Sequence, residues 1–202
     1  MTENNTYTSK DTLIRRIISE EYRMFSAVEN IGGRASCQDD YDTFYIMRYA
    51  QHSIFTENTL ESYLKDIEAA KAAERNLVTE KYSWMMEETD PIWFTERLSP
   101  YLPRISEWKM RMVERMTLTF MECYEHVKKQ YPDILAWGRS PYDNQGGASI
   151  RLYFSSELKT WSEVTLLLAC QDVVSHLERR DNPVSKIYEK IMDFYGHMTA
   201  GR

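Results

Sequence analysis

The chain has 202 residues, of which 43% are hydrophobic, 13% aromatic and 28% charged. This composition is typical of a folded protein with an aromatic-rich core and excludes disorder for most of the chain. The 25 basic and 31 acidic residues give a net charge of −6. That balance argues against nucleic acid and against an anionic membrane as partners, because both attract basic surfaces.

The cysteines are Cys37, Cys123 and Cys170, and no two of them are close in the sequence. Disulfide frameworks and zinc sites need paired or closely spaced cysteines, so the sequence predicts neither. The N-terminal residues are polar, and the longest apolar stretch runs only from Val164 to Cys170. We therefore expect no signal peptide, no membrane span and a cytoplasmic location.

Residues 34–137 contain no glycine. Strand-rich folds need glycines at their many turns, so this gap favours long helices joined by few loops. The predicted fold class is all-α, in the form of a compact multi-helix bundle. We expect residues 1–9 to be a flexible N-terminus and residues 10–198 to form a single helical domain.

Apolar residues that recur three and four positions apart predict the individual helices. The expected ranges are 10–29, 40–54, Thr56 or Thr59 to about residue 90, 106–130, 156–179 and 183–195. Asp39 and Asp40 are N-cap candidates for the second helix. Pro91 should end the third, because the residue before a proline leaves the helical conformation. Residues 91–103 are then a connector, and residues 149–154 either a helix or an extended linker.

The two halves of the chain, residues 10–90 and 105–195, resemble each other faintly. Each has a helix, a loop that contains Gly-Arg, and further helices, and the run Arg75-Asn76-Leu77-Val78 is echoed by Asp181-Asn182-Pro183-Val184. One interpretation is a duplicated helical unit packed with pseudo-two-fold symmetry. The other is that both halves are helix hairpins whose loops share Gly-Arg by coincidence.

Several polar residues occupy positions where a helix is otherwise apolar. Glu21 has only apolar residues one helical turn away on either side, Arg48 and Gln51 share an apolar helix face, and Lys81 is surrounded by apolar neighbours. Residues so placed face the core. A buried carboxylate must be paired, metal-bound or protonated, so these positions indicate a buried polar cluster.

Two interpretations of these polar residues stay open. In the first they form structural ion pairs, with Glu21 bonded to Arg48 and Lys81 bonded to Glu74 or Glu80. In the second, several helices point charged groups into one cavity, which is how helical bundles build ligand sites.

The loop Gly32–Asp40 concentrates reactive side chains. Arg34 offers a planar guanidinium for a carboxylate or phosphate, and Cys37 is a candidate nucleophile. Asp39 and Asp40 can exchange protons or cap the following helix.

Metal ligation is the weaker reading of the histidines. Glu122 and His126, and likewise Asp172 and His176, are four residues apart and lie on one helix face. Such acid–histidine pairs are common on helix surfaces, so the sequence indicates no metal site and no identifiable cofactor.

The run GGRASCQDD, with Phe44, Ile46-Met47-Arg48 and Gln51 after it, resembles a bacterial family catalogued as a domain of unknown function, number 4125. The later runs LESYLKDIEAAK, RNLVTEKY and Glu157-Leu158-Lys159-Thr160 share this resemblance. The likeness covers about residues 10–195. The resemblance implies one compact helical domain and supplies neither a reaction nor a cofactor. It directs attention to the glycine loop and to Arg48, Gln51, Glu80, Lys81 and Tyr82.

The leading hypothesis is a polar pocket between helices, beside the Gly32–Asp40 loop, that binds a small polar or anionic molecule. Whether the protein is an enzyme stays open. The candidate ligand-binding residues are Arg34, Arg48, Gln51, Lys81, Tyr82 and Arg139. The candidates for proton transfer or nucleophilic attack are Glu21, Cys37, Asp39 and Asp40.

Two alternatives come from other functional classes. A helical protein-interaction module would have a purely structural polar core and an exposed apolar patch, and self-association into a homo-oligomer is also open. An RNA-cleaving helical domain of the HEPN type is disfavoured, because Arg48 and His52 are one residue too close for the expected motif.

Overall fold

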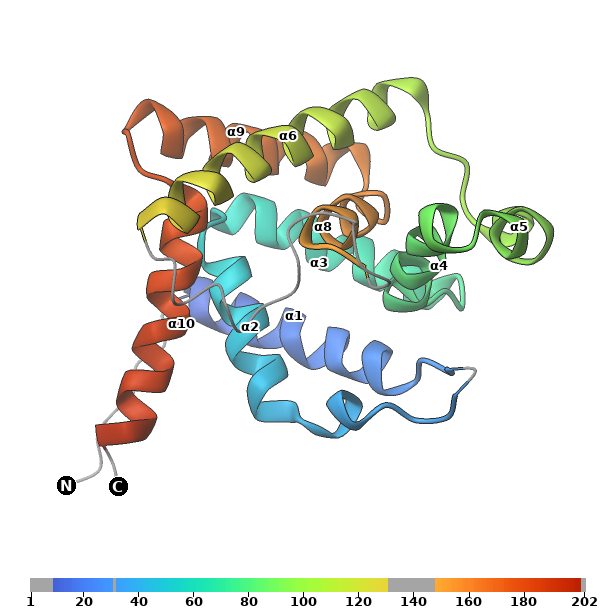
Figure 1. The fold of residues 1–202 in the computed structure, drawn as a ribbon, viewed down its shortest axis with the longest axis horizontal. Coiled ribbons are helices and arrows are strands. Elements are labelled where there is room, and N and C mark those ends of the chain that lie inside the picture. Colours follow the sequence, from blue (N-terminus) through green and yellow to red (C-terminus); the bar gives the residue numbers. More distant parts are fainter. Residues whose placement is uncertain (1–8, 31, 131–147, 201–202) are drawn as a thin grey trace.

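A computed structural model of the protein describes residues 9–30, 32–130 and 148–200, with side chains up to residue 196. These residues form helices and no strand, which confirms the predicted all-α class (Figure 1). The helices are α1 Ser9–Ser26, α2 Tyr41–Ser53, α3 Glu57–Ala72, α4 Leu77–Thr89, α5 Pro91–Trp93, α6 Glu107–Gln130, α8 Ile150–Leu158, α9 Glu163–Glu178 and α10 Pro183–Ala200. In the view of Figure 1, α6 and α9 run along the top, α1 and α2 lie at the bottom, and α3 and α8 lie between them.

The helix expected to run from Thr56 to residue 90 is two helices, so this prediction was wrong. The chain turns between α3 and α4, where Glu74 has a φ of 55°. The Asn76 side chain then accepts hydrogen bonds from the backbone N–H of Val78 and Thr79, both at 3.0 Å, and so caps α4. Neither glycine nor proline marks this break, because an asparagine cap is enough to start a new helix.

The helix expected over residues 156–179 is likewise divided. Residues 149–154, predicted as helix or linker, belong to the start of α8, and Ser149 caps that helix. Ser162 caps α9 by accepting a hydrogen bond from the Thr165 N–H. The expected connector over residues 91–103 contains only α5 and two short irregular helical turns.

The predicted N-terminal segment and second loop lie mainly outside the described residues. Helix α1 begins at Ser9, so this residue is helical, and nothing is described for residues 1–8. The loop over residues 137–149 falls almost wholly within residues 131–147, which are also outside.

Helices α3 and α9 cap each other reciprocally. Asp66 on α3 accepts a 2.9 Å hydrogen bond from the N–H of Ser162, the N-cap residue of α9. Asp172 on α9 accepts a 2.8 Å hydrogen bond from the N–H of Thr56, the N-cap residue of α3. Each helix therefore supplies the carboxylate that stabilises the positive end of the other.

The helices that follow α3 and α9 also make corresponding contacts. Helix α4 packs against α8, and α10 packs against α2. Asn76 caps α4 and donates to the Met24 carbonyl of α1, while Asn182 caps α10 and donates to the Cys123 carbonyl of α6. The two halves of the chain therefore share this asparagine contact. That the halves arose by duplication stays a prediction.

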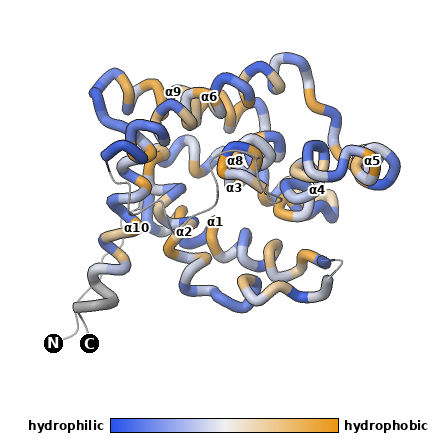
Figure 2. The backbone as a smooth tube through the Cα atoms, in the orientation of Figure 1, coloured by the Kyte–Doolittle hydropathy of each residue, from blue (hydrophilic) through white to orange (hydrophobic). Residues whose placement is uncertain are grey.

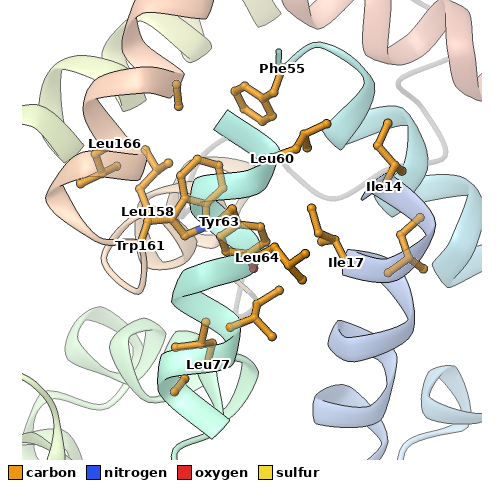
Figure 3. Packing of buried hydrophobic residues seen from close by; sticks show 14 of the residues in the cluster. Ile14, Ile17, Phe55, Leu60, Tyr63, Leu64, Leu77, Leu158, Trp161 and Leu166 are labelled. Carbon is orange, nitrogen blue, oxygen red and sulfur yellow. The ribbon is translucent and has the colours of Figure 1, made fainter. Parts of the chain in front are cut away.

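The main hydrophobic core lies where α1 and α3 meet α8 and α9 (Figure 3). Ile17, Leu60 and Leu158 are fully buried there, and burial of one such side chain contributes about 1.5–3 kcal/mol to folding. Figure 2 shows hydrophobic residues spread along all the labelled helices, with none of these helices hydrophobic throughout. In the described part of the chain, no helix is both long enough and apolar enough to cross a membrane.

Candidate functional site

Arg48 of α2 is the centre of a buried polar cluster. Its Nε and Nη2 atoms donate to the two carboxylate oxygens of Glu21 on α1, at 2.8 and 2.5 Å. Its Nη2 and Nη1 atoms donate to the two oxygens of Glu157 on α8, at 2.8 and 3.1 Å. Its Nη1 also donates to Gln51 Oε1 at 2.5 Å. All five N–H groups of this guanidinium therefore have acceptors within the protein.

Glu21 has further partners although only 3% of its side chain is exposed. His52 Nε2 lies 3.1 and 3.2 Å from its two carboxylate oxygens. The same ring nitrogen lies 3.2 Å from Arg48 Nη2, so His52 contacts both members of the Glu21–Arg48 pair. Tyr63 of α3 donates its hydroxyl to Glu21 Oε1 at 2.8 Å. The buried carboxylate is thus well supplied with donors.

Lys81 of α4 extends the cluster on the side of Glu157. Its Nζ donates to Tyr153 Oη at 2.7 Å and to Glu157 Oε2 at 3.2 Å. The same atom lies 4.0 Å from the ring centroid of Tyr153 and 5.6 Å from that of Tyr82, within the range of cation–π attraction. Lys81 is thereby held between two rings and a carboxylate.

The charges in the cluster balance, because two carboxylates face two cations. Burial raises the pKa of Glu21, but the charge of Arg48 and the hydrogen bonds with Arg48 and His52 outweigh it, so this pKa lies well below its ordinary value. Burial likewise raises the pKa of Glu157, and Arg48 and Lys81 together bring it below the ordinary value. Burial lowers the pKa of Lys81, and Tyr153 and Glu157 more than reverse this. Both carboxyl groups and the ammonium are therefore charged at neutral pH.

A cavity of about 820 Å³ opens against this cluster. Its lining includes Glu21, Arg48, Lys81 and Glu157. The rest is mainly apolar or aromatic and comes from helices of both halves of the chain, including Phe44, Phe120, Phe154, Trp161, Tyr188 and Tyr195. The cavity thus joins one charged region to extensive aromatic walls.

The glycine loop lies at the cavity only in part. Cys37 and Asp40 contribute to the lining. Asp40 is the N-cap of α2, since its carboxylate accepts from the Thr43 N–H at 3.0 Å, which confirms the predicted cap. Arg34 and Asp39 bond each other at 2.8 Å, with 48% and 65% of their side chains exposed, and neither lines the cavity.

The structure therefore gathers some of the predicted site residues and separates others. Those at the cavity are Glu21, Cys37, Asp40, Arg48, Gln51, Lys81 and Tyr82. Arg34 and Asp39 lie on the surface beside it, and Arg139 falls outside the described residues.

One predicted ion pair is confirmed and the other is wrong. Glu21 bonds Arg48 as expected. Lys81 bonds Glu157 instead of Glu74 or Glu80, and Glu80 bonds Arg75 at 2.7 Å. Glu74 and Glu80 lie close to Lys81 in the sequence, whereas α8 brings Glu157 to Lys81 from a position 76 residues away.

The sequence-based selection of site residues missed Glu157, His52, Tyr63 and Tyr153. Glu157 carries the same signal that singles out Glu21, because aromatic residues lie three and four positions away on its helix. Tyr63 lies in a predicted apolar stripe, where nothing separates a hydrogen-bonding tyrosine from a core-filling one.

Asp172 and His176, the acid–histidine pair on α9, form hydrogen bonds with other parts of the protein. Asp172 accepts hydrogen bonds from Thr56 and Thr59. His176 lies between the Asp181 carboxylate, at 3.0 Å, and the Ile54 carbonyl, at 2.9 Å. Within residues 9–30, 32–130 and 148–200, no group of three or more histidines, cysteines and acids is placed to hold a metal ion.

Comparison with known proteins identifies a family for this chain. Neither the curated proteins nor the solved structures include a match. The family described as "Protein of unknown function (DUF4125)" matches residues 11–201, in agreement with the resemblance stated above. The chain belongs to this family.

Proposed function

We propose that the cavity binds a small, uncharged organic molecule that has an apolar body and a polar group. The observation that supports this most is the state of Arg48, whose five N–H groups are all bonded to Glu21, Glu157 and Gln51. An arginine in this state cannot offer a free guanidinium fork to an anion.

The balance of charge points to the same class of ligand. Glu21 and Glu157 already compensate Arg48 and Lys81. An anionic group brought into this region would add a buried negative charge without a counterion, which is costly. The expectation of an anionic ligand held by Arg34 and Arg48 is therefore narrowed to an uncharged polar ligand.

Lys81 supplies the contact for the polar group. An ammonium has three N–H donors. Among the described residues, only Tyr153 and Glu157 accept hydrogen bonds from it. The third donor is available to a ligand oxygen or nitrogen at the cavity.

The remaining walls suit an apolar body. Small-molecule sites commonly have volumes of about 300–1,000 Å³ and mainly apolar linings with a few polar groups. The cavity of about 820 Å³ falls in this range. We assign binding and no reaction, because the volume and lining of this cavity fit a ligand site.

Equilibrium dialysis with two matched probes tests the proposal. 2-Acetylnaphthalene is an uncharged ketone, and 2-naphthoate has the same ring with a carboxylate. We expect the ketone to bind in a single site, and the carboxylate at least about tenfold more weakly because its charge is uncompensated. Tighter binding of 2-naphthoate would contradict the proposal.

Two variants of α6 locate the binding. Thr119 lines the cavity, and its neighbour Leu118 is 59% exposed and does not. Thr119→Trp should fill part of the cavity and weaken binding of the ketone at least tenfold, while Leu118→Trp should leave it unchanged. Equal binding by both variants would place the probe elsewhere.

A second candidate function, protein interaction, is favoured by the exposed face of α9. Val164, Leu167 and Val174 lie on this face and are 63%, 46% and 45% exposed. Such apolar surface is a feature of association sites. Sedimentation velocity over a range of protein concentrations should detect a dimer that Val164→Glu abolishes. A monomer at every concentration would exclude self-association through this face of α9.

A further inference from the structure

We infer that the bound molecule presents a hydrogen-bond acceptor to the indole N–H of Trp161. This inference rests on the proposed function and names a second point of recognition in the same cavity. It adds to the uncharged ligand a hydrogen-bond acceptor, such as a carbonyl oxygen or a ring nitrogen, that contacts Trp161.

The first observation is an unpaired donor. Trp161 is 3% exposed and lines the cavity. Within the described part of the chain, its Nε1 atom has no hydrogen-bond partner. Buried donors are nearly always paired, because leaving one unpaired destabilises the protein. The unpaired N–H therefore fits a partner that a ligand supplies.

The second observation is the position of Trp161 beside the polar cluster. Its ring lies 5.0 Å from that of Tyr63, centroid to centroid, and Figure 3 shows the two side chains next to each other. Tyr63 in turn donates to Glu21. A ligand that reaches the indole therefore lies close to the charged region.

The third observation is a comparison with the other half of the chain. Trp161 directly precedes Ser162, the N-cap residue of α9, and Phe55 directly precedes Thr56, the N-cap residue of α3. The rings of Phe55 and Trp161 meet edge to face, 5.7 Å apart. Because a phenyl ring fills the corresponding position, packing there does not require the indole N–H.

The test compares Trp161→Phe with the unchanged protein, using a pair of isosteric probes. 2-Acetylnaphthalene carries a carbonyl, and 2-isopropenylnaphthalene replaces that oxygen by a CH₂ group. Loss of one hydrogen bond should raise the dissociation constant of the ketone about tenfold. The constant of the alkene should change less than about twofold, since it makes no such bond. Equal changes for both probes would overturn the inference.

A measurement on the unchanged protein covers the case in which the variant does not fold. The indole N–H signal of Trp161 is followed by ¹⁵N-edited NMR, and the other tryptophan signals are assigned from single Trp→Phe variants. The ketone should shift the Trp161 proton downfield and the alkene should not. A bound ketone with no such shift overturns this inference and leaves the proposed function standing. If neither probe binds, the proposed function fails, and this inference fails with it.

Discussion

Two of the arginine–carboxylate pairs in the described part of the chain are alike in chemistry and opposite in surroundings. Arg48 and Glu21 bond at 2.5 Å with 7% and 3% of their side chains exposed. Arg34 and Asp39 bond at 2.8 Å on the surface, with 48% and 65% exposed. The sequence marks both pairs as candidates for a site, and only the buried one lies at the cavity.

The comparison shows that burial, and not the residue types, gives such a pair its importance. An exposed pair is screened by water and contributes little to stability. In a buried cluster every charge needs its partner, because desolvation of an unpaired charge is costly. The same requirement commits the donors of Arg48 to the protein. We therefore propose Lys81 and Trp161 as the groups that contact a ligand.

The largest expected effect comes from Arg48→Met. This change leaves Glu21 and Glu157 buried without their shared counterion, so the free energy of unfolding should fall by about 3–5 kcal/mol. Urea denaturation measures it. Arg34→Met is the matched control, and its unfolding midpoint should hardly move. Comparable losses for the two variants would contradict the distinction between the pairs.

A smaller loss is expected for Lys81→Met, since Glu157 keeps its bonds to Arg48. Removal of the charge-assisted hydrogen bonds should reduce the free energy of unfolding by about 2 kcal/mol. Adding Glu157→Gln restores the balance of charge and should recover part of this loss. Lys65→Met, on the exposed side of α3, is the control. A double variant less stable than Lys81→Met would show that charge balance does not govern the cluster.

The pH dependence of stability should reflect the two buried carboxylates, Glu21 and Glu157. The pKa of Glu21 and of Glu157 is lower in the folded protein than in the unfolded chain. Their contribution is therefore fully present above the unfolded value of about 4.3 and is lost as the pH falls through the folded value. Urea midpoints measured from pH 7 downward should fall more steeply for the unchanged protein than for Glu21→Gln. Parallel pH profiles for the two proteins would contradict the lowered pKa of Glu21 in the folded state.

The smallest expected effect belongs to the loop residue Asp40. Asp40→Ala removes the cap of α2 and should lower the melting temperature by about 2–4 °C. Asp42→Ala, in the first turn of the same helix, is the control because Asp42 makes no cap contact. The affinity for 2-acetylnaphthalene should stay the same in both. A large loss of affinity in Asp40→Ala would give this residue a direct part in binding.

Local pattern was enough to predict the fold class and one half of the cluster. Helical spacing identified Glu21 and Arg48 because both interrupt an apolar face of their own helix. The breaks after α3 and α8 were missed, because Asn76 and Ser162 cap new helices without a glycine or proline nearby. Glu157 and Tyr153 were missed as partners of Lys81, because their contact depends on how α8 packs against α4.

We expect the cavity beside Glu21, Arg48, Lys81 and Glu157 to hold a small molecule. Native mass spectra of the protein purified without added ligand test it most directly, with Leu118→Trp and Thr119→Trp measured in the same way. We predict an uncharged organic molecule bound to the unchanged protein and to Leu118→Trp, and lost from Thr119→Trp. The same bound mass in all three proteins, or none in any of them, would contradict the account.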